Sequence, residues 1–184
     1  MNWKLHKTVV LVGMMGAGKT AVGKALAATL DVPFLDSDAE IVSAANMSIA
    51  EIFERDGESF FRARESEVIA RLLEGQPCVL STGGGAFLAK RNREMISTHG
   101  VSVCLDASLE LIWSRVRNKD TRPLLRTANP YETLRDLYDT RAGIYAMADI
   151  SVEADAKYSI EDMSARVAKT LLSRPDVLER GDDA

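Results

Sequence analysis

The chain contains 184 residues, 46% of them hydrophobic and 27% charged, with a formal net charge of −4 at pH 7. These values are ordinary for a folded domain and argue against a broad nucleic-acid-binding surface, which needs excess positive charge. No run approaches the ~20 apolar residues that cross a membrane. Cys78 and Cys104 lie in apolar runs, which predicts buried, reduced thiols. We expect a cytoplasmic protein with a single domain over residues 1–174 and a flexible tail over residues 175–184.

The first predicted element is a buried strand over residues 8–12, followed by the segment GMMGAGKT. This segment fits the phosphate-binding pattern G-x-x-x-x-G-K-[ST], and a helical pattern follows over residues 21–30. In this context the loop and helix N-terminus bind phosphate oxygens, Lys19 reaches the outer phosphates and Thr20 ligates Mg²⁺. The motif predicts a nucleoside triphosphate with Mg²⁺ as ligand, bound by Gly16, Ala17, Gly18, Lys19, Thr20 and Ala21.

Two more predicted strands end in segments that suit a binding site. The second strand, residues 32–35, ends at Asp36-Ser37-Asp38, and the third, residues 78–81, runs into the segment TGGG. Consecutive glycines at a strand end indicate a close backbone approach. Because ligands bind beyond the carboxyl ends of strands in an open α/β sheet, we expect both segments and the phosphate loop to converge on one cleft.

Helices alternate with the strands. A capping box at Ser48 predicts a short helix that ends at Gly57, and a longer helix continues to about Glu74. A fourth strand is expected over residues 101–105 and a further helix over residues 108–117.

The C-terminal third begins with a polar segment, residues 118–128, whose lack of periodicity makes it a candidate mobile lid. Asn129 then caps a helix to about Met147, and a fifth strand is expected over residues 150–153. A last helix carries one apolar face. Strands that alternate with helices predict a parallel sheet covered on both faces.

The two carboxylates after the second strand can divide two roles between them. Near Mg²⁺, a carboxylate such as Asp36 holds the metal's water shell, while a second, Asp38, accepts a hydrogen bond from the attacking hydroxyl. The alternative is that both only cap the helix that starts near Ala39. After the fourth strand, we interpret Asp106 as a helix cap rather than a magnesium ligand.

An arginine in the candidate lid suits phosphoryl transfer, because negative charge spreads over the moving group in the transition state. Arg122 is that candidate, and a solvated loop arginine is the alternative. Spacing alone does not identify Arg62 or Arg141 as binding residues. The default interpretation of Arg62 is a charged residue on a solvated helix face.

Together these segments resemble the shikimate kinase family from about Val9 to Leu172. The resemblance implies a three-layer α/β P-loop NTPase fold, with a five-stranded parallel sheet in the order 2-3-1-4-5, flanking helices and a mobile lid. It also implies ATP- and Mg²⁺-dependent phosphorylation of the 3-hydroxyl of shikimate, a step of chorismate and aromatic amino-acid biosynthesis. The specific signals are Asp36-Ser37-Asp38, Phe61-Arg62, Thr82-Gly83-Gly84-Gly85, Arg122-Pro123-Leu124-Leu125, and Arg141 followed by Tyr145.

The resemblance also implies roles for individual residues. Asp38 would bind the shikimate hydroxyls and draw on the attacking proton, and Asp36 would lie in the outer shell of Mg²⁺ held by Thr20. A clamp of Arg62 and Arg141 would hold the substrate carboxylate, to which a planar guanidinium can donate two parallel hydrogen bonds. The remaining implied contacts are Lys19 as a catalytic residue, Gly83, Gly84 and Gly85 at the ring hydroxyls, Arg122 at ATP, and Arg115 near adenine.

Two other functions stay open at this point. A gluconate kinase on the same scaffold would also phosphorylate a carboxylated polyol, whereas a non-catalytic nucleotide-binding module would be expected to lack acceptor-site residues. The sequence shows no obvious heptad pattern or long exposed apolar stripe. We therefore expect a monomer that acts on a small molecule, without a nucleic-acid or membrane partner.

Overall fold

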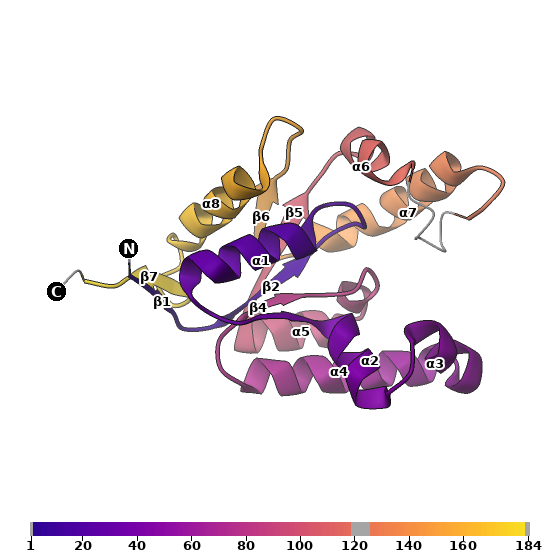
Figure 1. The fold of residues 1–184 in the computed structure, drawn as a ribbon, viewed down its shortest axis with the longest axis horizontal. Helices are drawn as coiled ribbons and strands as arrows, with labels where there is room; N and C mark the ends of the chain where they lie inside the picture. The colour runs from indigo at the N-terminus through magenta and orange to yellow at the C-terminus, as the bar shows by residue number, and fades with distance from the viewer. Residues whose placement is uncertain (1, 119–125, 183–184) are drawn as a thin grey trace.

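The computed structural model describes residues 2–118 and 126–182. At its centre lies a five-stranded parallel sheet in the order β3-β4-β2-β5-β6 (Figure 1). Counted along the chain within this sheet, the order is 2-3-1-4-5, so the predicted topology is confirmed. The strands are β2 (Thr8–Val12), β3 (Phe34–Asp36), β4 (Val79–Ser81), β5 (Gly100–Asp106) and β6 (Ile150–Glu153).

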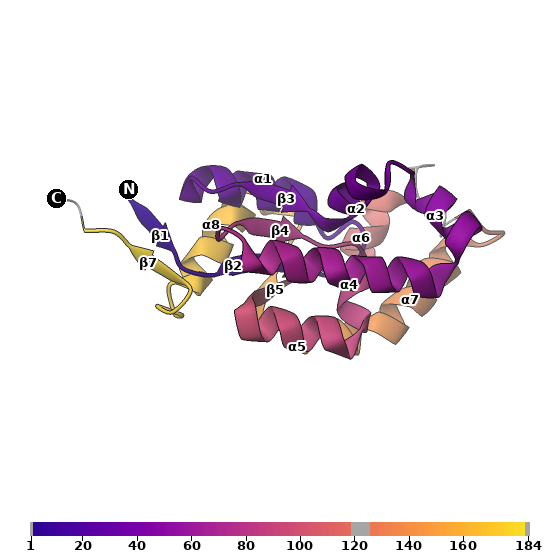
Figure 2. The same ribbon diagram turned by 90° about the horizontal axis from the view of Figure 1, so that it is seen from below.

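Helices cover both faces of this sheet. On one face α1 (Lys19–Leu30) packs against α8 (Ile160–Leu171), and on the other α4 (Glu58–Glu74) packs against α5 (Lys90–His99) (Figure 2). The predicted three-layer α/β fold is therefore confirmed. Of these helices, α5 was not predicted, because among its ten residues only Met95 and Ile96 are apolar.

The main hydrophobic core surrounds the central strand. All five residues of β2 are buried, since the strand has a hydrogen-bonded neighbour on each side and helices on both faces. Cys78 and Cys104 are buried free thiols, as predicted. A second, smaller cluster joins α2 (Ser37–Ala45), α3 (Ile49–Asp56) and α4, and consists of Ile41, Ile52, Phe61 and Val68.

Side-chain caps fix where several helices begin. Ser48 Oγ accepts a hydrogen bond from Glu51 N at 3.1 Å, and Asn129 caps α7 (Pro130–Tyr145), so both predicted caps are confirmed. For α6 (Leu109–Val116) the cap is Ser108, whose side chain accepts a hydrogen bond from the backbone of the helix's first turn. The interpretation of Asp106 as a helix cap is therefore wrong, and this residue instead ends β5.

The C-terminal segment differs from the sequence-based expectation. Residues 178–180 form β7 (Leu178–Arg180), which pairs in antiparallel fashion with β1 (Trp3–Leu5). Val177 and Leu178 are buried, so a flexible tail is the wrong description of this part of the chain. Gly181 N donates to the Asn2 carbonyl at 2.8 Å, which holds the two ends together beyond the amino ends of the sheet's strands (Figure 1). In the described residues, no helix is long and apolar enough to cross a membrane.

Candidate active site

The phosphate loop joins β2 to α1 at the carboxyl end of the central strand. Gly13, Gly16 and Gly18 have φ angles of 140°, 77° and 99°, a region that strongly favours glycine. Space is a second requirement at Gly16, where a Cβ would lie 2.8 Å from the Val116 side chain. Because α1 begins at Lys19, directly after the loop, its N-terminal N–H groups are available to phosphate oxygens.

A pocket of about 480 Å³ lies beside this loop. Lys19 Nζ donates to the carbonyls of Gly13 and Met14, at 2.6 and 3.1 Å, so the lysine lies back along the loop. Arg115 Nη1 donates to the Gly16 carbonyl at 2.9 Å, which brings α6 to the same pocket. The pocket lining includes every predicted nucleotide-binding residue within the described chain: Gly16, Ala17, Gly18, Lys19, Thr20, Ala21 and Arg115.

The opposite wall of this pocket comes from the segment before α8 and the start of that helix. Tyr158 and Ile160 line it, and the guanidinium of Arg166 lies 4.3 Å from the centre of the Tyr158 ring. Sequence reasoning did not single out Tyr158, because an aromatic residue in a polar loop carries no distinctive pattern. The stacked arginine fixes the Tyr158 ring at the edge of the pocket.

The two aspartates lie at the junction of β3 and α2. Asp36 caps α2, since its Oδ1 accepts a hydrogen bond from Ala39 N at 3.0 Å. Capping is therefore one role of Asp36, and its second carboxylate oxygen stays available for another. Burial raises the pKa of Asp38, the Asp36 carboxylate raises it further, and Arg62 and Lys19 act in the opposite direction. Asp38 therefore interacts electrostatically with both the phosphate loop, through Lys19, and α4, through Arg62.

Two of the three glycines after β4 lie directly against predicted acceptor-site side chains. A Cβ on Gly83 would lie 2.6 Å from Asp38 Oδ1, and a Cβ on Gly85 would overlap the guanidinium of Arg62. A residue with a side chain would displace these groups. The backbone of this segment therefore forms one wall of a site that also contains the aspartate and the arginine.

The middle glycine is contacted from α7. The Tyr145 hydroxyl donates a hydrogen bond to the Gly84 carbonyl, and a Cβ on Gly84 would lie 3.5 Å from Arg141 Nη1. Burial raises the pKa of Tyr145, and the neighbouring Arg141 lowers it. The glycine segment, residues 83–85, thus lies between α7 on one side and Asp38 with Arg62 on the other. The structure therefore brings all the predicted acceptor-site residues together.

Sequence reasoning missed one residue of this site, Glu65. Its side chain is 1% exposed, and Oε1 lies 3.0 Å from Arg62 Nη1. Burial raises the pKa of Glu65, while the hydrogen bond from Arg62 lowers it. A second carboxylate, Glu58, lies 3.7 Å from Arg62 Nε. The i,i+3 spacing of Arg62 and Glu65 was the available signal, but the same spacing occurs on solvated helix faces.

A buried polar bridge connects α4 to the end of the glycine segment. Asn92, 0% exposed, donates through Nδ2 to the Ala86 carbonyl at 2.8 Å and accepts a hydrogen bond from Ser66 Oγ at 2.7 Å. Ser66 Oγ also lies 3.1 Å from the carbonyl oxygen of Arg62. Since Ala86 opens η1 (Ala86–Leu88) directly after Gly85, Asn92 links the arginine-bearing turn of α4 to the glycine backbone. The sequence gives no local sign of this bridge.

The donor groups beside the phosphate loop fit Mg²⁺, a hard cation that proteins bind through few oxygen ligands together with substrate phosphates. These groups are the Thr20 hydroxyl in the first turn of α1 and the Asp36 carboxylate. Within residues 2–118 and 126–182, no group of three or more His, Cys, Asp or Glu side chains forms an all-protein metal site. Arg122 and the central part of the expected lid lie outside the described residues.

A phosphate loop that faces two carboxylates and two arginines defines a small-molecule kinase of the P-loop class. The guanidinium groups suit an acceptor that carries a carboxylate. The family model for shikimate kinase matches residues 15–172. The chain belongs to the shikimate kinase family.

Individual relatives agree with this membership. The shikimate kinase of Ruegeria pomeroyi is 71% identical over 175 residues, which cover 95% of this chain and 90% of the relative. That of Cereibacter sphaeroides is 64% identical over 176 residues, covering 96% and 88%. A solved structure of shikimate kinase from Acinetobacter baumannii in complex with shikimate aligns with a TM-score of 0.83 and 39% identity, over 91% of this chain and 93% of that one.

Proposed function

We propose that this chain transfers the γ-phosphoryl group of ATP to the 3-hydroxyl of shikimate, giving ADP and shikimate 3-phosphate in the biosynthesis of chorismate and aromatic amino acids. The observation that carries the proposal is the contact of the glycine segment with Asp38 and Arg62, beside the phosphate loop. It supports an acceptor site for a hydroxylated carboxylic acid within reach of a nucleotide. Family membership supports shikimate as that acid.

In this proposal the two arginines bind the shikimate carboxylate. Arg62 and Arg141 come from different helices, α4 and α7, and both reach the glycine segment, at Gly85 and Gly84 respectively. A planar guanidinium donates two parallel hydrogen bonds to a carboxylate, so two of them fix both the position and the plane of the substrate. Glu65 keeps Arg62 from turning back toward solvent.

The reacting hydroxyl would then lie between the glycine backbone and Asp38. The 3-hydroxyl oxygen forms a bond to the γ-phosphorus, the bond to the β,γ-bridging oxygen breaks, and the hydroxyl proton passes to the Asp38 carboxylate. The raised pKa of Asp38 favours this transfer, because a stronger base accepts the proton more readily. Gly83, Gly84 and Gly85 carry no side chains of their own at this wall, while the Gly83 N–H donates to Ser37 Oγ and the Gly84 carbonyl accepts from the Tyr145 hydroxyl.

The nucleotide side has a matching division of roles. Lys19 would bind the outer phosphates, Arg115 would pack near adenine, and Thr20 with Asp36 would hold Mg²⁺, which neutralises charge on the phosphates when bound. The lid arginine, Arg122, stays a proposal from the family resemblance. A monomeric, cytoplasmic enzyme without nucleic-acid or membrane partners is likewise proposed, and light scattering of the purified protein tests the monomer.

The test of function is ADP release by purified protein with ATP and Mg²⁺ against a panel of hydroxy acids. We expect ADP to form with shikimate and at background rate with gluconate or without an acceptor. Mass spectrometry of the product should show one added phosphate on shikimate. Equal ADP release in all three reactions would reject the proposal, and a reaction with gluconate alone would assign the chain to gluconate phosphorylation.

A further inference from the structure

A second pocket lies between α2, α3 and α4, on the outer side of α4 relative to the active site. It has a volume of about 680 Å³ and shares no lining residue with the nucleotide pocket or with the acceptor site described above. That volume is within the usual range for small-molecule sites, roughly 300–1,000 Å³. We call it the α2–α4 pocket. Nothing in the proposed reaction uses it.

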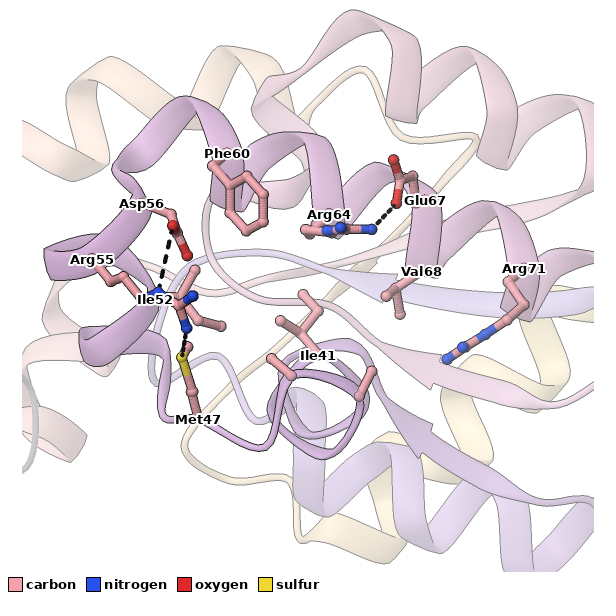
Figure 3. A pocket seen from close by; sticks show the side chains of 12 residues that line it. Ile41, Met47, Ile52, Arg55, Asp56, Phe60, Arg64, Glu67, Val68 and Arg71 are labelled. Carbon is pink, nitrogen blue, oxygen red and sulfur yellow. Dashed lines mark hydrogen bonds and ion pairs between the residues drawn. The ribbon is translucent and has the colours of Figure 1, made fainter.

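The floor of the α2–α4 pocket is apolar. Ile41, Ile52 and Val68 line it, are 3%, 2% and 8% exposed, and come from three different helices. Phe60 stands at the upper edge with 41% of its surface exposed, and Figure 3 shows its ring beside the opening. An exposed aromatic ring next to a concave apolar surface offers a stacking partner for a flat ligand.

Arginines surround this apolar floor. Arg64 is already engaged, since its Nη1 lies 2.9 Å from Glu67 and its guanidinium lies over the Phe60 ring. Arg71 is different, because its nearest carboxylate, Glu40, is 3.8 Å away, beyond hydrogen-bond distance. In Figure 3 the Arg71 side chain extends from α4 toward α2 at one end of the pocket. The Arg71 guanidinium is therefore placed to pair with a ligand.

The arginine at the other end of the pocket is also weakly paired. Arg55 Nε lies 3.9 Å from Asp56, and its Nη1 contacts the Met47 sulfur at 3.7 Å. Sulfur is a weak acceptor, and an exposed ion pair at this distance contributes little. Glu40 beside Arg71 brings the nearby acids to three, equal to the three arginines of the lining, so the site's suitability for an anion rests on the weak pairing of Arg71 and Arg55.

We propose that the α2–α4 pocket is a second small-molecule site, which binds an aromatic carboxylate with its ring on the apolar floor beside Phe60 and its carboxylate paired with Arg71. The ring supplies apolar contact, and the guanidinium recognises the planar carboxylate through two hydrogen bonds. The site is independent of the proposed catalytic function, because it shares no residue with the acceptor site. α2 and α4 nevertheless belong to both, through Asp38 and Arg62.

Binding of 2-naphthoate to ¹⁵N-labelled full-length protein, followed by NMR, tests this site. The experiment is run with ADP and shikimate at saturating concentration, so that the active site is filled. We expect saturable shifts of the backbone amides of residues 41, 52, 64, 68 and 71, and at least tenfold weaker binding of the neutral 2-naphthamide. Shifts confined to the phosphate loop or glycine segment, or equal binding of the amide, would overturn the proposal.

Variants distinguish binding in the α2–α4 pocket from non-specific binding of an aromatic anion to the protein surface. Arg71→Gln should weaken 2-naphthoate binding at least tenfold, whereas Arg135→Gln, which removes an exposed arginine on α7, should leave it unchanged. Ala44→Phe places a large side chain at an exposed position of the lining and should abolish binding without loss of fold. If both arginine variants bind alike, or Ala44→Phe binds normally, the ligand does not occupy the α2–α4 pocket.

Discussion

The guanidinium of Arg62 lies against the backbone of Gly85, so closely that a Cβ at residue 85 would occupy the same space. On its other side the guanidinium is hydrogen-bonded to the buried Glu65. The Arg62 side chain is therefore held in place between the Glu65 carboxylate and the backbone of Gly85. This arrangement leaves little freedom for the group that we assign to the substrate carboxylate.

Gly85→Ala should affect the substrate more than the fold. The added methyl pushes the Arg62 guanidinium away from residue 85 and so moves the clamp. We expect the shikimate KM to rise about tenfold or more, with the ATP KM within about twofold of wild type. Steady-state kinetics with each substrate varied in turn gives both constants.

Gly143→Ala is the matched control for that substitution. Apart from its chain neighbours and the nearby backbone of its own helix, α7, no described atom lies within 4 Å of a Cβ placed at Gly143. Alanine is favoured over glycine in a helix by about 0.5–1 kcal/mol, so this variant should melt at a higher temperature and keep both KM values. A shikimate KM that rose equally in both variants would show that the effect at residue 85 is not specific to Arg62.

Arg62→Lys tests the carboxylate clamp itself. Lysine keeps the charge and loses the planar pair of donors, and charge-assisted hydrogen bonds contribute about 1.5–3 kcal/mol each. The shikimate KM should therefore rise at least about tenfold, while the ATP KM stays near its wild-type value. Arg64→Lys, on the opposite face of the same helix, should leave both unchanged. Parallel changes in the two constants would exclude the role assigned to Arg62.

Asp38→Asn should separate turnover from binding. Loss of a general base costs about 10²–10⁴-fold in rate, so kcat should fall by at least about 100-fold with ATP binding retained in calorimetry. Near-normal kcat would remove Asp38 from the proton path. The comparison is made at a fixed pH near 7, where the wild-type carboxylate is needed in its charged form.

The raised pKa of Asp38 predicts a pH dependence of stability. Because the folded state holds this proton more tightly than the unfolded state, ionisation of Asp38 reduces stability as pH rises from the ordinary value of 3.8 through the raised folded-state value. Asp38→Asn removes this loss, so the variant should melt above wild type at pH 7 and approach it at pH 3. Thermal melts at both pH values measure the difference.

The cause of that shift can be tested directly. A ¹³C NMR titration should place the Asp38 carboxyl above 3.8 in wild type, and Asp36→Asn should lower its midpoint, since the Asp36 charge is the second contributor after burial. An unchanged midpoint in Asp36→Asn would mean that burial alone raises the pKa of Asp38.

Asn92→Ala probes the bridge between α4 and the glycine segment. The substitution leaves the buried Ala86 carbonyl without this donor, which costs about 1–3 kcal/mol, whereas the part-buried Ser66 hydroxyl can still donate to the Arg62 carbonyl. We expect a lower melting temperature together with a higher shikimate KM and an unchanged ATP KM. A purely structural role would lower stability without any difference between the two KM values.

The sequence predicts the central sheet well because β2 and β5 are compact apolar runs and the strands alternate with helices, although β6 has only the weaker pattern Ile-Ser-Val-Glu. The phosphate loop is equally visible, since its glycines and Lys19 form a contiguous pattern. By contrast, α5 has only Met95 and Ile96 as apolar residues, and its packing on β5 depends on the completed sheet. β1 and β7 are three residues each, and their pairing joins opposite ends of the chain, so no local pattern reports it.

Some residues of the acceptor site could likewise be predicted from the sequence, and others could not. Asp38 and the glycine segment follow predicted strands, and their meeting follows from the rule that parallel strands end at one edge. Arg62 and Arg141 could be assigned only through family resemblance, because an arginine in a helix is most often solvated. Glu65 pairs with Arg62 within α4, at a spacing that solvated helix faces share, so its burial could not be predicted from the sequence. Asn92 acts through a contact between helices, which forms only when α4 packs against α5.

The pairing of β1 with β7 has a practical consequence for protein engineering. Because Gly181 N donates to the Asn2 carbonyl at the edge remote from the phosphate loop, a short peptide that joins residues 2 and 181 would lie far from the proposed catalytic residues. A circular permutant opened at exposed residues between α2 and α3 should therefore fold. Proteins fused to the new ends would then be attached beside α2 and α3 instead of next to β1 and β7.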